Sequence, residues 1–117
     1  MNEYHGIIID ISLRNPLFIE KFNIIGSKKG MDYQAYKVLV EREDINSVML
    51  EMQKNLVEGF YCHFYDNSSL FVVFSDKIFK AIPNPKSWSK IIKHGRLRGI
   101  PEEQLDFSPS KFEEEEW

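Results

Sequence analysis

His63 is the side chain of this 117-residue sequence best suited to proton transfer, because histidine titrates close to neutral pH. Together with Asp10, which interrupts an isoleucine-rich stretch, it could act as the general base of a small hydrolase or isomerase. The simpler interpretation is a half-buried strand histidine that is hydrogen-bonded to a tyrosine hydroxyl or a backbone group. Neither interpretation is excluded by the sequence.

Cys62 precedes His63, but a Cys–His nucleophilic pair is not expected. Adjacent residues of a strand point to opposite faces, so the two side chains cannot share a proton, and we expect Cys62 to be a small core residue. The three histidines are scattered, and no glycine spacing matches a phosphate-binding loop. We therefore expect no metal and no cofactor, and we favour a non-enzymatic protein, with a small enzyme that uses His63 and Asp10 as an alternative.

Residues 77–98 carry seven basic side chains and no acidic one, although the net charge of the chain is −3. A basic cluster of this kind is typical of sites for nucleic acid or another anionic ligand, whose binding weakens steeply with salt. The candidate residues are Lys86, Lys90, Lys93, Arg96 and Arg98. The favoured alternative is a solvated helix face, partly neutralised by the seven acids of residues 102–117.

Residues 60–65 and 70–75 predict a β-hairpin around the polar turn at residues 66–69. With the turn centred on Asn67 and Ser68, Phe64 lies opposite Phe71 on a face suited to burial. The other face is aromatic with polar tips. It consists of Tyr61, His63, Tyr65 and Phe74, and is here called the aromatic face.

Three interpretations of the aromatic face remain open. It could be the interface of a homodimer or of a complex with another protein, because tyrosine is enriched in such patches. It could be a platform on which nucleic-acid bases stack, although the strand carries no Lys or Arg. It could also be covered by the C-terminal helix that contains Trp88. Our functional hypothesis is a non-enzymatic interaction module, because we expect a chain this short to leave one side of the hairpin uncovered.

The order of the expected elements predicts an α+β fold of the ferredoxin-like sandwich type. A mainly antiparallel sheet is covered by helices on one face, with an added C-terminal strand and helix. The expected strands are residues 4–13, 23–27, 33–41, 60–65, 70–75 and 78–82; the helices begin after Asn15, at Asp44 and after Asn84.

The length is below the roughly 150 residues of a typical domain, so we expect a single domain over residues 1–107. Residues 108–117 form an acidic tail that is expected to be mobile, with Trp117 docked on the body or on a neighbouring subunit. The longest apolar run, Leu70–Phe74, is too short to cross a bilayer, and the first residues do not form a signal peptide. We therefore expect a cytoplasmic protein.

Three strings of the sequence resemble a family of short, uncharacterised bacterial single-domain proteins of unknown function. They are Gly59–Phe64, Leu70–Phe74 and the closing Gly99-Ile-Pro-Glu-Glu-Gln-Leu-Asp-Phe107. The resemblance implies a cytoplasmic protein that functions without a further domain. It implies no activity, cofactor or catalytic residue.

Overall fold

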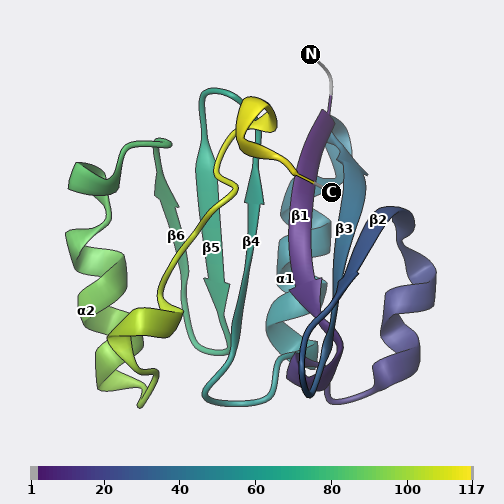
Figure 1. Cartoon of the computed structure of the whole chain (residues 1–117), viewed down its shortest axis with the longest axis horizontal. Helices are drawn as coiled ribbons and strands as arrows, with labels where there is room; N and C mark the ends of the chain where they lie inside the picture. Colours follow the sequence, from purple (N-terminus) through teal and green to yellow (C-terminus); the bar gives the residue numbers. More distant parts are fainter. Residues whose placement is uncertain (1–2, 117) are drawn as a thin grey trace.

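The computed structural model describes residues 3–116, which form an α+β fold around one open, antiparallel sheet (Figure 1). The sheet has six strands in the spatial order β2-β3-β1-β4-β5-β6. They are β1 (Glu3–Ile9), β2 (Asn23–Lys29), β3 (Gln34–Glu41), β4 (Tyr61–Tyr65), β5 (Leu70–Phe74) and β6 (Ile78–Ala81).

The isoleucine-rich β1 is a central strand, paired with β3 on one side and with β4 on the other. It ends earlier than the expected residue 13, because Asp10–Ser12 forms a short 3-10 helix, η1. The β4–β5 hairpin has the predicted register, with Tyr61 opposite Phe74 and Phe64 opposite Phe71.

One face of the sheet is covered by α1 (Ile45–Asn55) and by the 3-10 helix η2 (Pro16–Lys21). The apolar stripe of α1 follows the three-and-four spacing of a core-facing helix, and Met49 and Met52 are buried against the sheet. The η2 helix begins as predicted, with Pro16 at its first turn and the Asn15 side chain accepting a hydrogen bond from the Leu17 amide.

The sequence analysis expected helices on one face of the sheet only, but the opposite face is also covered. The helix α2 (Ser89–Leu97) covers it over β5 and β6, and the C-terminal segment crosses it towards β1. Figure 1 shows this segment, in yellow, in front of the sheet and α1 behind it. Residues 105–116 of this segment are here called the strap.

The remaining helical turns are short 3-10 helices in the connections. They are η3 (Arg42–Asp44), η4 (Pro85–Ser87), η5 (Glu102–Gln104) and η6 (Phe112–Glu114). Within residues 3–116, no helix combines the length and the apolar character that crossing a membrane requires.

Candidate functional site

The aromatic face is the place where side chains from distant parts of the chain converge, because the strap lies across it. At its first end the strap inserts Phe107, which is fully buried and makes edge-to-face contacts with the rings of Tyr61 and Trp88. The Tyr61 hydroxyl donates a hydrogen bond to the Gln104 carbonyl. Leu105 lies directly against Gly95 of α2, where a Cβ atom would meet the leucine side chain at 2.5 Å.

His63 holds the middle of the strap. Its Nε2 lies 2.9 Å from the carbonyl oxygen of Pro109, and since a carbonyl can only accept, the ring N–H donates. The imidazole stacks on the Tyr65 ring at a centroid distance of 5.6 Å. Burial lowers the pKa of His63 to about 4, so the side chain is neutral at physiological pH and acts as a hydrogen-bond donor.

The far end of the strap is held by its carboxylate at Glu115. His5 Nδ1 and the Tyr65 hydroxyl each lie 2.5 Å from Glu115 Oε2, and Lys37 Nζ lies 3.4 Å from Oε1. These three side chains come from β1, β4 and β3 and are here called the carboxylate cradle.

The hydrogen bonds and the charge of the cradle together favour the ionised form of Glu115. Burial alone would raise the pKa of this carboxyl, but the hydrogen bonds from Tyr65 and His5 and the charge of Lys37 outweigh it and lower the pKa. The same contacts act in the opposite direction on the phenol. Burial, followed by the bond to Glu115, raises the pKa of Tyr65, so its hydroxyl stays protonated and donates.

An aromatic slot accompanies the cradle. The Phe112 ring lies 4.3 Å from the His5 ring and 6.0 Å from the Tyr65 ring, measured between centroids. The Phe112 amide donates to the side chain of Asn67, in the turn between β4 and β5. The site therefore holds the strap at an aromatic ring and, three residues later, at a carboxylate.

The expectation that the aromatic face is open to a partner is wrong for this structure. Tyr65, Phe74 and His63 are 0%, 1% and 4% exposed, and Tyr61 is partly buried. The cause is the predicted acidic tail, whose residues 108–116 lie on the sheet because Phe107, Pro109 and Phe112 have apolar surface to bury. Trp117 lies outside the described residues.

The proposed pair of His63 and Asp10 is not brought together. Asp10 lies beyond the end of β1, where its carboxylate accepts hydrogen bonds from the amides of Ile11 and Gln34. His63 is instead occupied by the Pro109 carbonyl. Cys62 is buried on the α1 side of the sheet, and burial raises the pKa of its thiol, as expected for a core residue. No three His, Cys, Asp or Glu side chains of the described residues are grouped to hold a metal ion.

The basic candidates lie on and around α2. Lys86, Lys90 and Lys93 are exposed, whereas the two arginines are in ion pairs with acids: Arg96 with Glu102, and Arg98 with Glu58 and Asp76. These pairs reduce the positive charge that an anionic ligand would meet. Anion binding by this group stays a prediction from the sequence.

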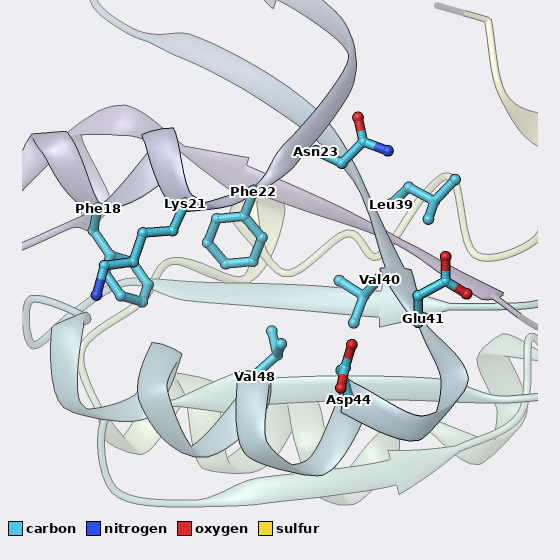
Figure 2. A pocket seen from close by; sticks show the side chains of 9 residues that line it. All are labelled: Phe18, Lys21, Phe22, Asn23, Leu39, Val40, Glu41, Asp44 and Val48. Atoms are coloured by element: carbon cyan, nitrogen blue, oxygen red, sulfur yellow. The ribbon is translucent and has the colours of Figure 1, made fainter.

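A separate pocket of about 270 Å³ lies between η2 and α1, on the face opposite the strap (Figure 2). Phe18, Phe22 and Val48 supply apolar walls, and the carboxylates of Glu41 and Asp44 lie at one end. Lys21 and Asn23 are the other polar residues of its lining.

No family model, curated protein or solved structure matches this chain. The function must therefore be argued from the site itself.

Sequence reasoning found Tyr61, His63 and Tyr65 but missed the cradle residues His5 and Lys37, and Glu115 as their ligand. One signal was present. Lys37 lies on the strap side of β3 with Ala35 and Leu39, and it is only 7% exposed. A lysine among apolar residues on a buried strand face indicates a buried acidic partner.

Proposed function

We propose that this protein is a small non-enzymatic interaction module whose aromatic face binds an extended protein segment. In the isolated chain the strap occupies this face. One observation carries the proposal: the strap crosses the sheet, and its Glu115 carboxylate binds His5, Tyr65 and Lys37 in the carboxylate cradle. A segment of another chain with the same chemistry would find the same contacts.

The way in which the strap is held supports its exchange for another segment. Residues 105–116 contain no β-strand, so the strap takes no part in the hydrogen-bond ladder of the sheet. Its contacts are made by side chains: the His63 bond to Pro109, the Asn67 bond to Phe112 and the cradle around Glu115. None of the strand pairs of the sheet includes a residue of the strap.

A covalently attached segment has an effective concentration of the order of millimolar, so an external segment must compete with it. We therefore expect the unmodified chain to bind external segments weakly. A chain whose strap has lost its ring and its carboxylate should bind them more tightly.

The proposal is tested with the full-length variant Phe112→Ala/Glu115→Gln, here called the loosened-strap variant. It is titrated against a fluorescent peptide with the natural sequence of residues 108–117. We expect saturable binding by fluorescence anisotropy, at least about tenfold tighter than that of the unmodified chain. The same peptide should raise the melting temperature of the variant, because it binds the folded state.

The matched control is Glu116→Gln, which removes an exposed carboxylate one residue beyond the cradle. This variant should bind the peptide as weakly as the unmodified chain. If the loosened-strap variant gained neither peptide binding nor a peptide-dependent rise in melting temperature, the strap would be a fixed part of the fold and the proposal would be wrong.

We also propose a ferredoxin-like core within the α+β fold. The spatial order β4-β1-β3-β2, with α1 between β3 and β4 in the chain, supports this arrangement. The 3-10 helix η2 then stands in the position of the first helix of that fold, and β5, β6 and α2 extend the sheet beyond it.

A further inference from the structure

We infer that the segment recognised in trans is an acidic segment of a partner protein with the pattern Phe-X-X-Glu. This inference rests on the proposed function and names the chemistry of the partner. The strap itself displays the pattern, with Phe112 in the aromatic slot and Glu115 in the cradle.

The cradle selects a carboxylate rather than a neutral or basic group. His5 and Tyr65 present donors to one carboxylate oxygen, and the ammonium of Lys37 lies near the other. Lys37 is 7% exposed, so its ammonium favours a negatively charged side chain over a neutral one at this position. Hydrogen bonds to an ionised carboxylate are stronger than hydrogen bonds between two neutral groups.

The aromatic slot sets the register. The ring of Phe112 contacts His5 and Tyr65, two residues that also bind the carboxylate. The ring and the carboxylate therefore bind to the same pair of side chains, and the single turn of 3-10 helix, η6 (Phe112–Glu114), sets the distance between them. A segment with one residue more or fewer between ring and carboxylate cannot fill both positions.

The neighbouring contacts make few demands on the sequence of the partner. His63 binds a backbone carbonyl of the strap, which any residue provides, and Asn67 binds a backbone N–H, which any residue except proline provides. Glu113 and Glu116 of the strap are exposed. Within residues 108–116 we therefore expect specificity to be concentrated in two side chains, Phe112 and Glu115.

The experiment compares peptides of residues 108–117 on the loosened-strap variant. The natural peptide is set against Glu115→Gln, Phe112→Ala and the matched control Glu116→Gln. We expect the first two to bind at least about tenfold more weakly than the natural peptide, and the control to bind within about twofold of it. Adding Lys37→Met to the receptor should abolish the preference for Glu over Gln at position 115.

The outcomes separate the two claims. If the natural peptide neither bound nor raised the melting temperature, the proposed function would fail. If all four peptides bound alike, the aromatic face would still bind segments, but the Phe-X-X-Glu pattern would be wrong. If sedimentation showed the unmodified chain to be a dimer that Phe112→Ala dissociates, the partner would be a second copy of this chain instead of another protein.

Discussion

The His63 side chain is 4% exposed, and its Nε2–H group donates to the Pro109 carbonyl. Its type suggests acid–base catalysis, but its surroundings assign it another role. Burial penalises the charged imidazolium and lowers the pKa to about 4, which keeps the ring neutral and the hydrogen bond to the strap in place. A residue that appears catalytic in the sequence thus becomes a positioning group for the strap.

The lowered pKa of His63 predicts a pH-dependent stability. Between pH 6.5, its ordinary pKa, and about pH 4, the unfolded chain binds a proton that the folded chain does not. The free energy of unfolding therefore falls as the pH falls through this window, by up to about 1.4 kcal/mol per pH unit. The variant His63→Gln keeps an N–H donor without a titrating ring, so urea unfolding between pH 6.5 and 5 should show a flatter pH dependence.

The partly buried His94, which pairs with Asp76, provides the matched control. We expect His94→Gln to retain the slope of the unmodified chain, because this substitution leaves the His63 ring and its hydrogen bond to Pro109 in place. The pKa values of Glu115, Asp66 and Asp76 are lowered, so their stabilising contribution is complete above their ordinary pKa values and is lost only as the pH falls through and below them. These carboxyl groups therefore add no pH dependence above about pH 5. An unchanged slope in His63→Gln would show that another group governs the pH dependence.

At the scale of elements, the pairing of β1 with β4 depends on a glycine. Gly6 lies opposite Phe64, and the fully buried phenylalanine ring occupies the space where a side chain of residue 6 would be. A Cβ atom at residue 6 would lie 2.4 Å from Phe64 Cδ1. The absence of a side chain at residue 6 therefore lets the Phe64 ring pack against β1 on the α1 side of the sheet.

We expect Gly6→Ala to lower the free energy of unfolding by about 1–3 kcal/mol, the usual cost of overpacking a core. Urea unfolding at pH 7 measures the effect. The control is the double variant Gly6→Ala/Phe64→Leu. Because the smaller side chain relieves the contact, the double variant should be less destabilised than the sum of the single variants. Strictly additive effects would contradict the assigned contact.

At the scale of the whole molecule, the strap completes a second hydrophobic core. The core on the α1 side is built from the sheet, α1 and η2, whereas the core on the other side needs α2 and a segment from the end of the chain. Phe107 and Phe112 belong to this second core, and so both faces of the sheet are covered over β1 and β4. One face of the sheet is therefore covered by helices α1 and η2, and the other is covered in part by the strap, which does not pair with any strand.

This asymmetry predicts that the strap opens separately from the sheet. Regions held by few backbone hydrogen bonds exchange their amide protons through local openings that cost less free energy than global unfolding. In hydrogen-exchange mass spectrometry of the full chain, peptides covering residues 105–117 should exchange earlier than peptides covering β4 and β5. The variant Phe112→Ala should accelerate exchange in the strap alone.

Glu116→Gln again serves as the control and should leave exchange unchanged, because residue 116 is exposed. If the strap exchanged only together with β4 and β5, it would be an inseparable part of the core. That result would also count against its replacement by another segment.

Much of the local structure was predictable from the sequence. The hairpin register was correct because the polar turn at residues 66–69 centres the two apolar strands, and α1 was correct because its apolar residues recur at helical spacing. Asn15 and Asn84 were correctly placed as caps before prolines, and the amide that each side chain binds lies two residues away. These features depend on residues close together in the chain, so the sequence pattern contains them.

Only the tertiary structure decided what covers the aromatic face. The contact that anchors the strap joins His5 to Glu115, 110 residues apart, and no periodicity or spacing records such a pair. A run of four glutamates predicts a solvated tail because charges repel one another and prefer water. In the folded chain one of them meets Lys37, His5 and Tyr65, which three separate strands bring to one point, and their donors and charge compensate for its burial.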